Sequence, residues 1–86
     1  MARYSLEVKR SASHEIAALP TTEDCRLVVD RISKLADDPR PPGSEKLAGD
    51  TRYRVRQGPY RIIYELDDTA HLVVIVKVGH RREVYR

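Results

Sequence analysis

Arginine is concentrated in one short stretch of the 86-residue chain, Tyr53-Arg54-Val55-Arg56-Gln57-Gly58-Pro59-Tyr60-Arg61-Ile62-Ile63-Tyr64. No acidic residue lies between Thr51 and Tyr64. A guanidinium group keeps its charge at neutral pH and directs paired N–H donors at phosphate or carboxylate oxygens. The stretch therefore predicts an anion-binding surface. The structural alternative is an exposed sheet face that arginine keeps soluble and protects from aggregation.

The C-terminal tail, His80-Arg81-Arg82-Glu83-Val84-Tyr85-Arg86, adds further groups of the same kind. A tyrosine ring stacks on a nucleobase, and its hydroxyl can transfer a proton. Phosphate-binding arginines on strands, next to an aromatic tail, suit a single-stranded RNA. The candidate catalytic residues are Arg54, Arg56, Arg61, Arg81, Tyr85 and His80. Additional RNA contacts are predicted for Lys46, Arg52 and Arg82.

Such a cluster needs no metal to cleave RNA, because the 2′-hydroxyl of RNA supplies the nucleophile. Its attack on the adjacent phosphorus gives a 2′,3′-cyclic phosphate and a 5′-hydroxyl. The protein has to orient the attack in line, neutralise the developing charge and move protons. Because the pKa of arginine lies above about 12, arginine is a poor general base. Proton transfer is therefore assigned to His80, Tyr85 or the RNA and ribosome, with Lys46 as a more distant candidate.

Other chemistries have little support in the sequence. The single Cys25 rules out an internal disulfide and a cysteine-based metal site, and it occupies an apolar helical position typical of a small buried residue. His14, His71 and His80 do not stand at metal-ligand spacing from one another or from carboxylates. There is neither a glycine-rich phosphate loop nor a Gly-x-Ser-x-Gly motif. We expect no cofactor and no metal.

The arginine stretch itself has the alternation and the Gly-Pro break of a β-hairpin, with strands near 51–57 and 60–67. Side chains alternate between the two faces of a strand. One face is predicted to carry Arg52, Arg54, Arg56, Arg61, Ile63 and Glu65. The opposite face carries Tyr53, Val55, Gln57, Tyr60, Ile62 and Tyr64. The arginines, Arg61 and Arg81 included, are expected to face solvent.

The remaining elements follow from periodicity. Residues 3–9 predict a strand with Tyr4, Leu6 and Val8 on its buried face. A short helix capped by Ser11 or Ser13 is predicted to end before Pro20. A second helix begins at a Thr21–Asp24 capping motif, with an apolar stripe formed by Cys25, Val28, Val29, Ile32, Leu35 and Ala36. Residues 71–78 predict a central strand that Gly79 ends.

The predicted fold class is therefore a two-layer α+β domain. An N-terminal strand precedes a helical hairpin, and a three-stranded antiparallel meander follows. The helices are expected to pack on one face of a four-stranded sheet. At this length the whole chain, residues 1–86, is expected to form one domain.

The charge and hydropathy of the chain indicate where the protein acts and which partners it binds. The net charge is +3 and the pI about 9.2. The charges of residues 1–43 cancel, so the excess lies on the hairpin and the tail, which favours a nucleic acid or acidic protein partner. The N-terminus lacks the apolar segment of a signal peptide, and the longest apolar run, Leu72–Val76, is too short for a membrane span. We expect a cytoplasmic protein with no membrane partner.

Together, Lys46-Leu47, Tyr53-Arg54-Val55-Arg56, Gly58-x-Tyr60-Arg61-Ile62-Ile63-Tyr64 and Val78-Gly79-His80-Arg81-Arg82-Glu83-Val84-Tyr85 resemble the RelE/ParE family of type II toxins over essentially the whole chain. In the RelE branch, the resemblance implies a toxin that enters the ribosomal A site and cuts mRNA. Basic positions of that branch match Arg54 and Arg56, its phosphate-contacting arginines match Arg61 and Arg81, and its terminal tyrosine matches Tyr85. The hairpin arginines replace residues that are often lysine, and the chain stops at Arg86 without a C-terminal helix.

The ParE branch shares this scaffold but binds and inhibits DNA gyrase without nuclease activity. The joint presence of the arginines and Tyr85 favours the RelE branch. In either branch, the resemblance implies a cognate acidic antitoxin, through which alone the complex binds operator DNA. A plain RNA-binding or interaction module without toxicity is the third possibility.

Overall fold

The computed structural model describes residues 3–47 and 51–80. Its elements are β1 (Ser5–Val8), α1 (Arg10–Ala17), α2 (Thr22–Lys34), β2 (Glu45–Lys46), β3 (Arg52–Gln57), β4 (Tyr60–Asp67) and β5 (Leu72–His80). They form a mixed five-stranded sheet in the order β1-β5-β4-β3-β2. Strand β1 runs parallel to β5, and every other pair is antiparallel. The two-layer α+β prediction is confirmed.

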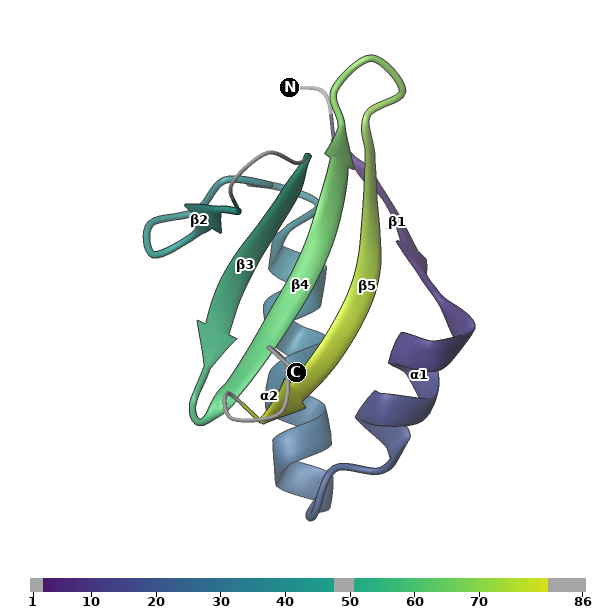
Figure 1. Cartoon of the computed structure of the whole chain (residues 1–86), viewed down its shortest axis with the longest axis vertical. Helices are drawn as coiled ribbons and strands as arrows, with labels where there is room; N and C mark the ends of the chain where they lie inside the picture. Colours follow the sequence, from purple (N-terminus) through teal and green to yellow (C-terminus); the bar gives the residue numbers. More distant parts are fainter. Residues whose placement is uncertain (1–2, 48–50, 81–86) are drawn as a thin grey trace.

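The two helices cover one face of the sheet, with α2 against β3 and β4 and α1 against β5 (Figure 1). Residues that alternate along the strands supply the apolar side of this contact, as the hairpin pattern predicts. The core combines Val55, Ile62, Tyr64, Val73 and Ile75 from the sheet with Ala12, Val28, Ile32 and Leu35 from the helical layer.

Helix α2 begins at a side-chain cap, as its sequence predicts. The Thr21 hydroxyl accepts a hydrogen bond from the Asp24 backbone N–H at 3.0 Å, which satisfies one of the unpaired donors of the first turn. The Asp24 carboxylate does not complete a capping box. Instead its Oδ2 accepts a hydrogen bond from the Tyr60 hydroxyl at 3.0 Å, which ties the start of α2 to the start of β4.

Four details of the predicted fold are wrong. The sheet has five strands rather than four, because Glu45–Lys46 pairs with β3; two residues are too few to show a period. Helix α1 begins at Arg10 without a side-chain cap at Lys9, so neither Ser11 nor Ser13 caps it. Gly79 does not end β5, which continues to His80. Val8 and Val29 are 42% and 48% exposed, because they lie at the margins of the stripes that predicted their burial.

A polar network joins four segments at the end of the sheet that holds the β4–β5 turn. Arg40 Nη2 lies 2.8 Å from Asp68 Oδ2, and Arg40 Nε donates to the Tyr53 hydroxyl at 3.1 Å. The Tyr4 hydroxyl donates to Asp68 Oδ1 at 2.5 Å. The hydrogen bonds from Arg40 and, secondarily, from Tyr4 lower the pKa of Asp68 to about 2. This network connects the N-terminal strand to the loop after α2 and to the hairpin.

No helix in the described ranges 3–47 and 51–80 is long and apolar enough to cross a membrane.

Candidate anion-binding site

The β3–β4 hairpin brings the predicted arginines together on the sheet face that the helices leave uncovered. Its pairs are Arg52↔Glu65, Arg54↔Ile63 and Arg56↔Arg61, so all of these side chains belong to one face. Val55, Ile62 and Tyr64 occupy the other face, in the core beneath α2. The predicted division of the hairpin into an arginine face and a core face is confirmed.

Arg56 and Arg61 are direct cross-strand partners next to the Gly58-Pro59 turn. Two like charges placed opposite each other on a sheet destabilise the pairing. An anion that lies between them offsets this repulsion, and a phosphate can accept hydrogen bonds from both guanidinium groups. The pair is the feature of the fold that most directly indicates an anionic ligand.

Carboxylates partly neutralise the other two hairpin arginines. Arg54 Nη2 lies 2.7 Å from Glu45 Oε2, and Arg52 Nε lies 3.0 Å from Glu65 Oε2. Glu45 comes from β2, outside the arginine stretch, so inspection of that stretch alone misses it. The sequence could predict the partner of Glu65, because a two-residue turn between Gln57 and Tyr60 places it opposite Arg52. Within residues 3–47 and 51–80, Arg52 and Arg54 are therefore held in ion pairs beside the like-charged pair at the turn.

Arg61 is buried, at 8% exposure, which contradicts the expectation that it faces solvent. The reason is its place on β4, a strand with neighbours on both sides, whereas Arg56 on β3 is exposed. Its cross-strand partner on β5 is Gly79, which contributes no side chain to this face. Only a small part of the Arg61 side chain is in contact with solvent, whereas the Arg56 side chain is exposed.

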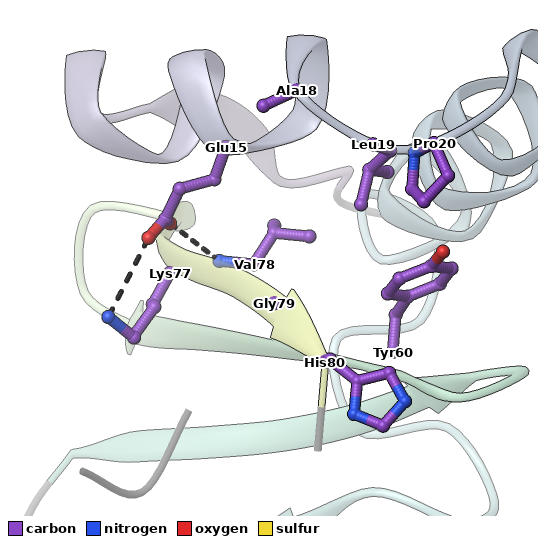
Figure 2. A pocket seen from close by; sticks show the side chains of 9 residues that line it. All are labelled: Glu15, Ala18, Leu19, Pro20, Tyr60, Lys77, Val78, Gly79 and His80. Carbon is purple, nitrogen blue, oxygen red and sulfur yellow. Dashed lines mark hydrogen bonds and ion pairs between the residues drawn. The ribbon is translucent and has the colours of Figure 1, made fainter. Parts of the chain in front are cut away.

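His80 lies at the end of β5, opposite Tyr60, and both belong to the helix-side face. The two rings meet edge to face, with centroids 6.3 Å apart and planes at 87°. Together with the end of α1 and the connection to α2, they line a cavity of about 430 Å³ (Figure 2). Burial and the hydrogen bond to Asp24 both raise the pKa of Tyr60, so this hydroxyl stays protonated and serves as a structural donor.

The other predicted residues do not all join the arginine face. Lys46 is the cross-strand partner of Tyr53 and so belongs to the opposite face, near the Arg40–Asp68 network. Arg81, Arg82 and Tyr85 lie outside the described residues. Among the described residues, no group of three or more histidine, cysteine, aspartate or glutamate side chains is arranged to hold a metal ion.

The fold of this small α+β domain, with two helices on one face of a mixed five-stranded sheet, matches that of solved RelE toxins. The structure superposes on the archaeal RelE of a RelE–RelB complex from Pyrococcus horikoshii, with a TM-score of 0.81 and 26% identity over 98% of this chain and 100% of that one. It superposes on a chain of the RelBE2 toxin–antitoxin complex from Mycobacterium tuberculosis with a TM-score of 0.80 and 27% identity, over 92% and 99% of the chains.

The sequence comparisons agree with the fold. The family model of the ParE toxin of type II toxin–antitoxin systems matches residues 6–85. The toxin RelG of Mycobacterium tuberculosis is 30% identical over 86 residues, which cover 96% of this chain and 97% of that protein. The chain belongs to the RelE/ParE family and is a toxin of a type II toxin–antitoxin system.

Proposed function

We propose that this toxin is a ribosome-dependent endoribonuclease that cuts mRNA in the A site and so inhibits translation. The observation that carries the proposal is the Arg56–Arg61 pair, two like charges opposite each other on the helix-free face. The negative charge of an RNA backbone bound between the two guanidinium groups would offset their repulsion. The similarity to the toxin RelG and to RelE chains at 26–27% identity supports this branch of the family.

In the proposed reaction the 2′-hydroxyl loses its proton to a general base, and its oxygen bonds to the adjacent phosphorus. The bond from phosphorus to the 5′-oxygen breaks, and that oxygen takes up a proton. These bond changes and proton transfers balance without a metal or a cofactor. Arg54, Arg56, Arg61 and Arg81 would bind the phosphate and its developing charge, because donors already in place need no reorganisation during the reaction. Arg52, Arg82 and Lys46 would contact the flanking RNA.

Proton transfer is assigned to His80 and Tyr85. Imidazole is the most frequent acid–base group in enzymes. His80 follows Gly79, the cross-strand partner of Arg61, but belongs to the opposite face of the sheet. For His80 to act, the RNA would have to pass the end of β5, where the two faces meet. Tyr85 would otherwise take this role or stack on a base of the codon.

The direct test is primer-extension mapping of mRNA on translating ribosomes with the purified toxin. We expect new 5′ ends within the A-site codon that appear only when ribosomes are present. Intact mRNA at a toxin dose that stops growth would contradict the proposal.

A second candidate function follows from the family model, whose description names ParE. On this alternative the toxin binds and inhibits DNA gyrase and has no nuclease activity. The arginine face would then contact an acidic protein surface, since guanidinium groups pair with carboxylates as well as with phosphates. Inhibition of gyrase supercoiling, together with intact mRNA on ribosomes, would select this alternative.

We further propose an acidic cognate antitoxin as the partner and the cytoplasm as the site of action. The structural relatives from Pyrococcus horikoshii and Mycobacterium tuberculosis are toxin–antitoxin complexes. The basic charge of this chain complements an acidic segment. Operator DNA would be bound only through the antitoxin. Co-expression with a cognate acidic antitoxin should restore growth, and a toxin that stays harmless when expressed alone would contradict its assignment as an active toxin.

A further inference from the structure

Strand β5 runs beyond the strand that supports its outer edge. The pairing with β1 covers Leu72–Ile75, and the last backbone hydrogen bond on this side runs from Lys9 N–H to the Ile75 carbonyl at 3.0 Å. The segment from Val76 to His80 has β4 on one side and α1 on the other. This segment carries Gly79, the partner of Arg61, and His80, the partner of Tyr60.

The same segment begins with a β-bulge. Tyr64 pairs with Ile75 but Ile63 pairs with Lys77, so Val76 is an extra residue on β5. Without it, Lys77 would lie opposite Ile62 in the core, and Val78 rather than Gly79 would lie opposite Arg61. The bulge therefore decides which residue borders the arginine face. Bulges near functional sites commonly re-aim side chains in this way, and they interrupt the hydrogen-bond ladder locally.

One side chain from α1 holds the segment immediately after the bulge. Glu15 Oε1 accepts a hydrogen bond from the Val78 backbone N–H at 2.9 Å, and Glu15 Oε2 lies 3.6 Å from Lys77 Nζ (Figure 2). The hydrogen bond satisfies a backbone donor on the edge that β1 no longer covers, where an unpaired N–H would be costly. A single carboxylate thus engages two successive residues that belong to opposite faces of the sheet.

We infer that Glu15 is a positioning residue for the arginine face: by holding the Val78 backbone it keeps the bulge in register and sets Gly79 and His80 against Arg61 and Tyr60. This inference rests on the proposed function for its catalytic consequence. Glu15 contacts the Val78 backbone and the Lys77 side chain, so its effect on the arginine face passes through β5. Helix α1 buries only Ala12 fully, so Glu15 is its main polar connection to the sheet among the described residues.

The test compares Glu15→Ala, Glu15→Gln and Lys77→Ala, with Glu23→Ala as the matched control. Glu23 is also a helical glutamate in an ion pair, but its partner is Arg26 and both lie on the exposed side of α2. Glutamine keeps an oxygen that can accept from Val78 N–H and loses the ion pair. Lys77→Ala loses the ion pair alone.

The first measurement is hydrogen exchange of the Val78, Gly79 and His80 amides by NMR. We expect Glu15→Ala to speed exchange at Val78 by about tenfold, the loss of one ordinary hydrogen bond. It should also shift the resonances of Gly79 and His80. Glu15→Gln, Lys77→Ala and Glu23→Ala should stay near the wild type. Unchanged exchange and unchanged resonances in Glu15→Ala would overturn the inference, whatever reaction the protein performs.

The second measurement is the rate of mRNA cleavage on ribosomes, per folded toxin molecule. Glu15→Ala should lower kcat by about tenfold with little change in KM, because the exposed arginine remains to bind the substrate. Glu15→Gln should restore most of the rate. Equal kcat values for Glu15→Ala and the wild type would overturn the positioning role. If the wild-type toxin cuts no mRNA, the proposed function fails, and the exchange measurement still decides whether Glu15 positions β5.

Discussion

Replacement of Arg56 by alanine separates function from stability more cleanly than any other change on the arginine face. Arg56 is exposed and stands directly opposite Arg61. Exposed side chains usually change the free energy of unfolding by no more than about 0.5 kcal/mol. Removal of a like-charge cross-strand neighbour relieves repulsion worth about 0.2–1 kcal/mol. Arg56→Ala should therefore be as stable as the wild type or slightly more stable.

Activity should change in the opposite direction. A hydrogen bond to a charged group contributes about 1.5–3 kcal/mol. Because each 1.4 kcal/mol corresponds to about tenfold, removal of the Arg56 guanidinium from the phosphate predicts a 10- to 150-fold drop in kcat/KM for mRNA cleavage. Affinity for a single-stranded RNA should also depend less steeply on salt, with a slope smaller by about 0.7 for each phosphate that is no longer neutralised.

The assay measures urea unfolding and ribosome-dependent cleavage on the same preparations, with Arg10→Ala as control. Arg10 is an equally exposed arginine on α1, remote from the arginine face. Arg56→Lys should fall between the wild type and Arg56→Ala, because lysine keeps the charge and loses the paired donors. The reasoning is refuted if Arg56→Ala unfolds more easily by more than about 1 kcal/mol. Full activity of Arg56→Ala would also refute it.

Three other predictions follow from burial and hydrogen bonding. Arg61→Ala should lose both activity and stability, since its side chain is only 8% exposed; a urea midpoint equal to the wild type would contradict this. Tyr64→Phe should lower the free energy of unfolding by about 0.5–1.5 kcal/mol, because the hydroxyl donates to the Pro39 carbonyl at 2.8 Å; urea denaturation of this variant and the wild type checks it, and equal midpoints would contradict it. Asp68, with a pKa of about 2, should contribute stability that is fully present above about pH 4 and is lost as the pH falls toward 2. Asp68→Asn should flatten this part of the pH–stability curve, and an unchanged slope would refute the assignment.

The hairpin shows how much of this fold the sequence could predict. The alternation on either side of Gly58-Pro59 gives both strands to within a residue, and with them the two faces and the core. The same pattern puts Glu65 on the arginine face. These features depend on neighbours within about a dozen residues, and a two-residue turn fixes the register between them.

The features that failed depend on contacts distant in the sequence. Strand β2 exists because Glu45 and Lys46 meet β3, and its two residues have no period of their own. The burial of Arg61 follows from the position of β4 between β3 and β5, which alternation within one strand does not reveal. The contact from Glu15 to Val78 spans 63 residues and depends on a bulge. Local sequence patterns therefore could not predict which site side chains are exposed or which residues they contact.

The most direct test of the proposed function maps mRNA ends on translating ribosomes with wild-type toxin and with Arg56→Ala, beside a gyrase supercoiling assay of the same samples. We expect A-site cuts by the wild type, cleavage that is 10- to 150-fold weaker with Arg56→Ala, and normal supercoiling with both proteins. Inhibited supercoiling with uncut mRNA would contradict the account and assign the toxin to the gyrase-binding branch.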